Sequence, residues 1–136
     1  MQLTRFTDYS LRVLIYLAAH PERLATIPEV ATAHRISQNH LMKVVHQLGL
    51  HGFIATQRGK GGGMRLARLP DDIRLGEVVR AMEENMALAE CFHSDIQGCA
   101  LLPGCGLKGV LVEARANFLA TLDRYTLADL VRPASF

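Results

Sequence analysis

Two helical patterns lie close together in the first 50 residues of this chain. Residues 26–29 (Thr-Ile-Pro-Glu) have the spacing of a capping box with proline in the first turn, and the helix that they start should end near His34. Ser37 is suited to cap a further helix, from residue 38 to about residue 50. Because only a few residues separate the two helices, the pattern predicts a helix-turn-helix.

The second helix of this pair has an apolar face and a polar face. Apolar residues recur at helical spacing and should face the core: Leu41, Val44, Val45 and Leu48. In a major groove, amide side chains can address adenine and lysine can address guanine, while the N-cap region meets phosphate. The residues that we expect to approach the groove are Ser37, Gln38, Asn39, His40 and Lys43. An ordinary solvated face is the alternative interpretation of this helix taken alone.

A glycine-rich, basic segment follows the helix pair. Residues 53–58 and 64–69 have the pattern of strands, and residues 59–63 (Gly-Lys-Gly-Gly-Gly) would join them as a hairpin. Arg58 and Lys60 place positive charge at the tip, where it can reach a minor groove or the phosphate backbone. A phosphate-binding P-loop is dismissed because Gly-Lys-Ser/Thr is absent and no helix follows at once. A helix-turn-helix followed by a basic hairpin predicts a winged helix.

Three longer helical patterns complete the chain. The first spans residues 7–19, with Thr7 as its N-cap and Asp8 in the first turn, where a negative charge suits the helix dipole. The second spans residues 75–85 and the third, a long final helix, spans residues 107–124. One more short helical turn is expected in the tail.

The long final helix carries apolar residues spaced three or four positions apart: Leu111, Ala114, Phe118 and Leu122. A winged-helix protein that reads a palindrome needs a dimer, so we expect this stripe to pair with a second subunit, with plain core packing as the alternative. The predicted fold is mainly α with a small β-hairpin wing. Residues 1–80 would form a winged helix-turn-helix DNA-binding domain, and residues 81–136 a cysteine loop and a dimerisation helix.

Charge and compartment are consistent with this prediction. Residues 1–80 carry 11 Lys and Arg against 6 Asp and Glu, a net charge of +5, whereas residues 81–136 carry 4 against 7, a net charge of −3. The basic half is a modest indication of nucleic-acid binding. No apolar run approaches a membrane span, and charged residues near the N-terminus exclude a signal peptide, so we expect a cytoplasmic protein with no membrane contact.

All three cysteines lie between Cys91 and Cys105, with seven residues separating Cys91 from Cys99 and five separating Cys99 from Cys105. Glycine and proline within the segment disfavour helix and strand, so we expect a loop whose thiols can converge. Thiolates favour zinc, copper(I) or iron–sulfur clusters, and clusters usually have four cysteine ligands. A fourth ligand would therefore have to come from elsewhere in the protein.

Other interpretations of the cysteines stay open at this point. They could be small buried apolar side chains, or two could form a disulfide. A zinc site is the stronger rival, although structural zinc fingers favour cysteine pairs two to four residues apart. An enzyme is not expected, because no nucleophile–base pair or HExxH motif indicates hydrolysis, and an electron-transfer protein would not need a helix-turn-helix with a basic wing.

Three segments resemble the bacterial Rrf-type winged-helix regulators: residues 3–9 (Leu-Thr-Arg-Phe-Thr-Asp-Tyr), residues 36–43 (Ile-Ser-Gln-Asn-His-Leu-Met-Lys) and residues 58–63 (Arg-Gly-Lys-Gly-Gly-Gly). The resemblance extends over nearly the whole chain. The three-cysteine loop before a long helix is similar to the cluster-binding, nitric-oxide-sensing members of that family.

This resemblance implies a homodimeric transcription repressor that binds a palindromic operator in double-stranded DNA and senses nitric oxide. It implies a 4Fe–4S cluster, rather than the less expected 2Fe–2S form, held by three cysteines and an N-terminal aspartate of the partner subunit. The matching residues are Cys91, Cys99, Cys105 and Asp8.

The chain departs from the family pattern in two respects. Its first cysteine gap is longer than is usual, which loosens the expected loop geometry. Members that regulate cluster biogenesis have a histidine shortly after the third cysteine, where this chain has Leu107 and Lys108. His93, inside the loop, is the alternative to Asp8 as fourth ligand. A redox-sensing regulator of cluster biogenesis or iron response, and a zinc-stabilised regulator, remain the alternative functions.

Overall fold

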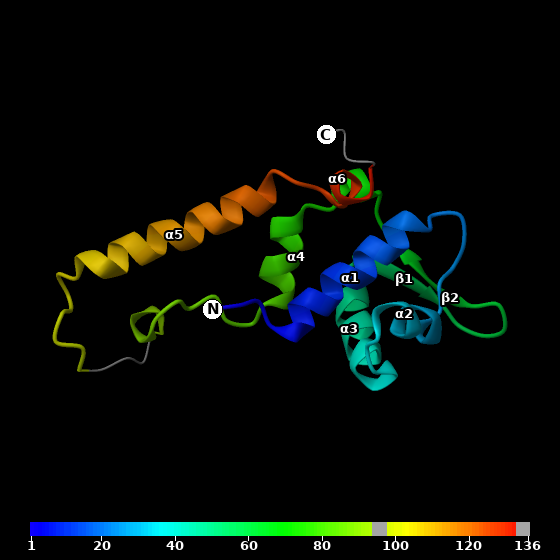
Figure 1. Ribbon diagram of the computed structural model, residues 1–136, viewed down its shortest axis with the longest axis horizontal. Helices are drawn as coiled ribbons and strands as arrows, with labels where there is room; N and C mark the ends of the chain where they lie inside the picture. The colour runs from blue at the N-terminus through cyan, green and yellow to red at the C-terminus, as the bar shows by residue number, and fades with distance from the viewer. Residues whose placement is uncertain (94–97, 133–136) are drawn as a thin grey trace.

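The computed structural model of the chain describes residues 1–93 and 98–132; residues 94–97, inside the expected cysteine loop, and residues 133–136 lie outside the described part. The elements in order are α1 (Arg5–Ala19), α2 (Ile27–His34), α3 (Gln38–Leu50), β1 (Ile54–Gln57), β2 (Gly63–Leu66), the 3₁₀ turn η1 (Pro70–Asp72), α4 (Leu75–Met82), the 3₁₀ turn η2 (Glu90–Phe92), α5 (Gly106–Asp123) and α6 (Leu127–Val131). The expected mainly helical fold with a two-stranded hairpin and a long C-terminal helix is confirmed (Figure 1).

The core lies in the winged-helix body, where α1 packs against α3, α4 and α6. The four apolar residues expected on the inner face of α3 are all buried: Leu41, Val44, Val45 and Leu48. They join buried residues of α1 and α4, together with Phe53 just before β1 and Met64 of β2, in one hydrophobic cluster. Burial of such side chains is the main favourable term in folding, so α1 and α3 form the rigid platform of the molecule.

Helix α1 begins one turn earlier than the sequence predicts. Thr4, not Thr7, is the N-cap, and its hydroxyl accepts the Thr7 backbone N–H at 3.3 Å. Thr7 is instead buried inside the helix, and its hydroxyl donates to Glu83 at the end of α4. Glu83 also accepts the backbone N–H of Thr4. The cap at Thr4 is a local one, and Glu83, 79 positions from Thr4, reinforces it with contacts that a local capping pattern cannot reveal.

The helix pair α2–α3 matches the sequence prediction. The capping box of Thr26 and Glu29 is formed at the start of α2, and Ser37 caps α3 by accepting the His40 N–H at 3.1 Å. Between the helices, Arg35 adopts the left-handed conformation (φ 56°, ψ 44°), which reverses the chain direction within a short turn. Such a φ is uncommon for a residue other than glycine, and it holds α3 at a fixed angle to α2.

The wing is an antiparallel hairpin in which Ile54 pairs with Leu66 and Gln57 with Gly63. Gly59 and Gly61 in its tip have φ of 96° and 77°. A Cβ on Gly62 would lie 2.2 Å from the Gln57 carbonyl oxygen, so the tip requires glycine there. Close to its tip, the hairpin is tied to the core by a backbone bridge between Ala25 and Met64.

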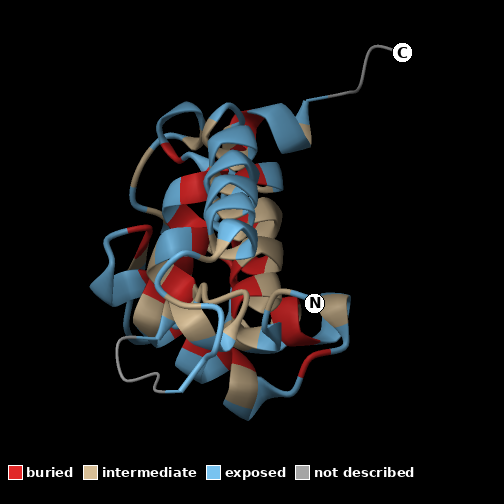
Figure 2. Ribbon diagram, turned by 90° about the vertical axis from the view of Figure 1, so that its left-hand side faces the viewer, coloured by how far each residue is buried: buried red, intermediate tan, exposed pale blue. Residues whose placement is uncertain are grey.

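Helix α5 extends away from this body, beyond α4, and the segment after α4 runs back beneath it (Figure 1). None of its 18 residues is fully buried, and Figure 2, which looks from the α5 side, shows most of it exposed. Its C-terminal end is held to α4, where both guanidinium nitrogens of Arg80 bind the Asp123 carboxylate at 2.6 and 2.9 Å. After it, the chain returns to the body through α6, whose Leu127 is fully buried. No helix in the described part is long and apolar enough to cross a membrane.

Candidate DNA-binding surface and cysteine loop

The polar residues at the start of α3 lie on the surface. Ser37, Gln38, Asn39 and Lys43 are exposed, and His40 is half-buried. The side chains on the opposite face of the helix are in the core, which fixes the rotation of α3 about its axis. The start of α3 therefore presents a hydroxyl, two amides, an imidazole and an ammonium group to solvent from a rigid element, as base reading requires.

The wing tip carries exposed positive charge. Arg58 and Lys60 are both exposed and form no ion pair with a carboxylate in the described part of the chain. Arg68, at the base of the hairpin, differs because it binds Glu77 at 2.8 Å. Unpaired cations are the groups that gain most from contact with phosphate, so the charge at the tip is available for DNA whereas that of Arg68 is already neutralised.

Two further exposed cations, in the helix-turn-helix turn and in the wing, were not expected from the sequence. Arg35 is exposed in the turn between α2 and α3, and Arg65 is exposed on β2 opposite Ala55. Both lack an ion pair among the residues described. The sequence signals that could have identified them are a cation within a helix-turn-helix turn and the position of Arg65 between apolar Met64 and Leu66 in a strand pattern.

Helix α1 contacts the start of α3 through aromatic side chains. The ring of Tyr9 lies edge-on to the His40 ring, with centroids 4.9 Å apart. The Arg12 guanidinium lies 5.6 Å from the Tyr9 ring and binds Asp8 with two hydrogen bonds of 3.0 Å. Asp8, the expected fourth ligand, is half-buried in the first turn of α1. A change at Asp8 can therefore be passed to His40 through directly contacting side chains.

The three cysteines are all free thiols. Cys91 lies in η2 and is half-buried, Cys99 is exposed, and Cys105 is the half-buried N-cap residue of α5. Within residues 1–93 and 98–132, no three His, Cys, Asp or Glu side chains lie close enough to hold a metal ion. The single chain thus does not bring the cysteines together with Asp8 or with exposed His93.

The donor set nevertheless fits an iron–sulfur cluster chemically. Thiolates are the usual protein ligands of such clusters, and none of these three thiols is consumed by a disulfide or buried in the core. No ligand from a second subunit is present in a single chain. The three thiols are therefore free to act as ligands of such a cluster.

A surface groove of about 1410 Å³ runs between α3, β1 and the end of α4. Lys43 and Arg58 line one part of it, and Glu83 and Glu84 line another. The groove places the beginning of the segment that leads to Cys91 beside the helix with the polar exposed face. Of the α3 residues expected to approach DNA, Lys43 lines this groove, and none of the three cysteines does.

Comparison with known proteins identifies the family. The family model described as Rrf2, iron-dependent transcriptional regulator, matches residues 3–133. The HTH-type transcriptional regulator NsrR of Bacillus subtilis (strain 168) is 53% identical over 133 residues, covering 97% of this chain and 91% of the relative. The NsrR of Shouchella clausii (strain KSM-K16) is 52% identical over 132 residues, covering 96% of this chain and 89% of the relative.

Solved structures agree on the fold. CymR, the global cysteine regulator of B. subtilis, superposes with a TM-score of 0.79 at 23% identity and 99% coverage of both chains. IscR of T. potens has a TM-score of 0.76 at 23% identity, covering all of this chain and 94% of the other. The curated relatives are transcription regulators and not enzymes. With a family match over residues 3–133 and relatives about half identical over almost its whole length, this protein belongs to the Rrf2 family of DNA-binding transcription regulators.

Proposed function

We propose that the protein is a dimeric repressor that binds a palindromic operator and releases it when nitric oxide reacts with an iron–sulfur cluster in the cysteine loop. The observation that carries this proposal is the coexistence of three free thiols in the segment 91–105 with a winged helix whose wing-tip cations, Arg58 and Lys60, form no ion pair in the described part of the chain. The similarity to regulators named NsrR supports nitric oxide as the signal. Such a protein works in the cytoplasm, where bacterial DNA lies.

In the proposed complex, α3 enters the major groove with Ser37, Gln38, Asn39, His40 and Lys43 toward the base edges. Arg58 and Lys60 contact the backbone or the minor groove. The exposure of these residues and the rigid packing of α3 support this assignment. Residues 1–80 are thus proposed to bind DNA, and residues 81–136 to carry the sensing loop and the dimer helix.

The proposed dimer forms through α5. This helix exposes large apolar side chains that its own chain leaves uncovered, among them Leu107 and Val110 at 61% and Phe118 at 43%. An apolar face of this kind on a helix that projects from the body is typical of a protein interface. A dimer also matches the two-fold symmetry of a palindrome and sets the spacing of the two α3 helices.

The proposed cluster is of the 4Fe–4S type, held by Cys91, Cys99 and Cys105 with Asp8 of the other subunit as fourth ligand. When bound, it supplies iron that reacts with nitric oxide. Asp8 would then have two competing partners: the cluster site of the other subunit and Arg12 of its own chain, which binds it with two hydrogen bonds. The state of Asp8 then acts on Tyr9 and His40, the contacts that join α1 to the start of α3.

The experiment replaces each of Cys91, Cys99 and Cys105 by Ala in protein purified without oxygen. Each variant should be colourless and contain little iron or sulfide, because a four-ligand site cannot lose one of its three thiolates. Each variant should also bind the operator weakly. Retention of a full cluster by one variant would remove that residue from the ligand set. A colourless unaltered protein containing zinc would support the zinc-stabilised regulator instead.

The Asp8 assignment needs a mixed dimer of one subunit lacking Asp8 and one lacking the three cysteines. If Asp8 acts across the interface, one of the two sites is intact and half of the normal cluster content assembles. If it acts within its own subunit, neither site is intact. Normal clusters with His93 bound in place of Asp8 would contradict the assignment altogether.

A further inference from the structure

The inner face of α5 carries one charged residue at its centre. The half-buried residues of the helix recur at helical spacing: Lys108, Leu111, Arg115, Leu119, Leu122 and Asp123. Leu122 packs against the core and Asp123 binds Arg80, so the C-terminal part of this face is held by the body of the chain. Arg115 lies two turns earlier on the same face, and its described contacts are made with residues outside α4.

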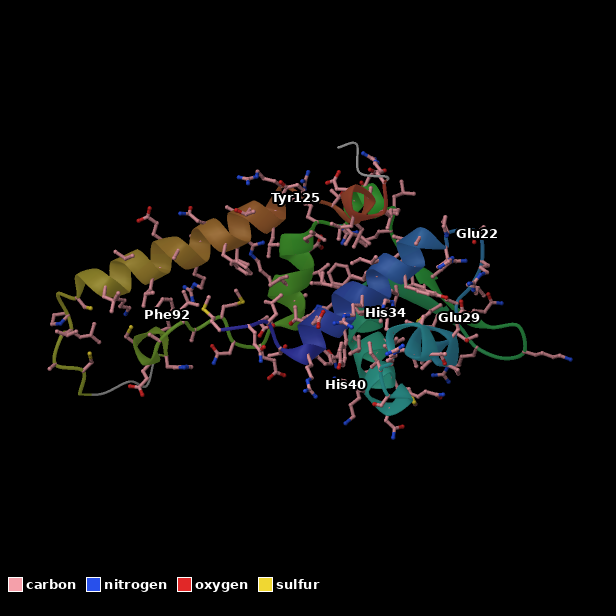
Figure 3. All side chains as sticks on the ribbon, in the orientation of Figure 1. Glu22, Glu29, His34, His40, Phe92 and Tyr125 are labelled. Atoms are coloured by element: carbon pink, nitrogen blue, oxygen red, sulfur yellow. The ribbon has the colours of Figure 1, made fainter. Side chains whose placement is uncertain are left out.

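Arg115 contacts the segment that leads from α4 to the first cysteine. Its guanidinium lies 4.6 Å from the centroid of the Phe92 ring, and its Nη1 donates to the Met86 carbonyl oxygen at 3.3 Å. Phe92 is the last residue of η2, and its label in Figure 3 lies on the side of η2 that faces α5. The two contacts are made six residues apart on the same segment, so one side chain holds residues 86–92 against the helix.

We infer that Arg115 is a positioning residue for the cysteine loop: it fixes the Cys91 side of the loop against α5, the helix whose N-cap is Cys105. This inference deepens the proposed function and rests on it, because it concerns how the chain orients two of the proposed ligands. Cys91 immediately precedes Phe92 and shares the turn η2 with it. Fixing the Phe92 ring therefore restricts the position of the neighbouring thiol before any cluster is bound.

The two contacts require arginine and an aromatic ring. A planar guanidinium can stack on a ring and donate a hydrogen bond sideways at the same time, whereas a lysine ammonium is a compact charge without that geometry. Arg115 has no ion pair in the described part of the chain, so its charge is not already engaged by a carboxylate. An apolar side chain in place of Phe92 would preserve packing but remove the attraction to the cation.

The test compares the full-length unaltered chain with Arg115→Ala, Phe92→Leu, the double variant and the conservative Phe92→Tyr. Alkylation of the cluster-free chain by iodoacetamide is followed at each cysteine by mass spectrometry. Cys91 should react about fivefold faster in Arg115→Ala and Phe92→Leu, the ratio expected for loss of one cation–π contact. The alkylation rate at Cys99 should be unchanged. At Cys91, the double variant should react as fast as the single variants, and Phe92→Tyr should react as slowly as the unaltered chain. Arg124→Ala, the same change at the exposed end of α5, is the control.

A second readout follows loss of iron and sulfide to a chelator, which should also be about fivefold faster in Arg115→Ala. Unchanged Cys91 alkylation, or faster alkylation with unchanged cluster loss, would overturn the inference. If the unaltered protein assembles no cluster, the proposed function fails, while selective exposure of Cys91 still supports the role of Arg115 in holding the segment. General acceleration at all three cysteines would mean unfolding and would also overturn the inference.

Discussion

At the scale of single residues, the cations of this protein divide into those that already have a carboxylate partner and those that do not. Lys60 at the wing tip belongs to the second group. Changing Lys60 to Ala should weaken binding to all DNA sequences about equally and reduce the slope of log K against log salt by about 1, because one phosphate contact is lost. Fluorescence anisotropy at several salt concentrations measures both quantities.

Arg124→Ala, which removes the same charge far from the wing, should leave affinity and salt slope unchanged. An unaltered salt slope in Lys60→Ala would show that the wing tip does not contact phosphate. A change confined to particular base pairs would instead assign Lys60 to base reading, a role that we give to Gln38 and Asn39.

Glu29 connects the α2 capping box to α1. A hydrogen bond from the Tyr16 hydroxyl, at 2.7 Å, lowers the pKa of Glu29, and Arg23 lowers it further. Because this pKa is lower in the folded state, the stabilisation is present above the ordinary pKa of a glutamate, about 4.3, and is lost as pH falls through the folded value. Glu29→Gln should therefore destabilise the fold by about 1 kcal/mol at pH 7 and flatten the acid side of its stability profile.

Urea unfolding between pH 7 and pH 3 tests this. Glu84→Gln is the matched control, since Glu84 is exposed, forms no ion pair in the described part of the chain and lies outside the capping box. If Glu29→Gln and Glu84→Gln gave the same profile, the network around Glu29 would contribute no pH-dependent stability.

At the scale of elements, the sequence predicts those parts of the fold that local chemistry determines. The capping box of α2 and the Ser37 cap of α3 are confirmed, because both depend on residues three positions apart. The start of α1 was predicted wrongly, because the sequence offers two threonines and the cap is Thr4, while Thr7 is buried and donates to Glu83 at the end of α4. No local sequence pattern predicts the contact between Thr4 and a carboxylate 79 positions away.

The apolar stripe on α5 shows a second limit. The predicted stripe spans two neighbouring faces, because Leu111 and Leu122 are half-buried whereas Ala114 and Phe118 are exposed. Periodicity detects apolar residues at helical spacing but cannot separate the side covered by the chain itself from the side left for a partner. The cysteines show a third limit, since their spacing indicates the ligand type but not a geometry that needs a second subunit.

Helix α6 is short, but it is an integral part of the core. Leu127 is fully buried in the main cluster, and its backbone N–H donates to the Ile73 carbonyl at 3.0 Å. Leu127→Ala should lower the free energy of unfolding by about 2–4 kcal/mol, the usual cost of a cavity in a packed core. Leu130→Ala, at a position 44% exposed, should change it by less than about 0.5 kcal/mol. Equal effects in urea unfolding would show that α6 does not anchor the C-terminal segment.

At the scale of the whole molecule, the account requires a dimer through α5. Phe118→Glu places a charge on the exposed apolar face and should convert the protein to monomers, because burying an unpaired carboxylate opposes association. Ala120→Glu puts the same charge at another exposed position of α5, on the far side of the helix by its spacing, and should leave the dimer intact. Analytical ultracentrifugation distinguishes the two. A dimeric Phe118→Glu variant would place the interface elsewhere.

The central claim is that a cluster in the cysteine loop controls DNA binding by the winged helix. The most direct measurement is operator binding by the anaerobic dimer, titrated with nitric oxide while cluster absorbance is recorded in the same sample. We predict tight binding before addition and loss of binding in step with loss of the cluster absorbance, with no response in Cys105→Ala. Binding that persists after the absorbance has been lost, or a colourless protein that binds equally well, would contradict the account.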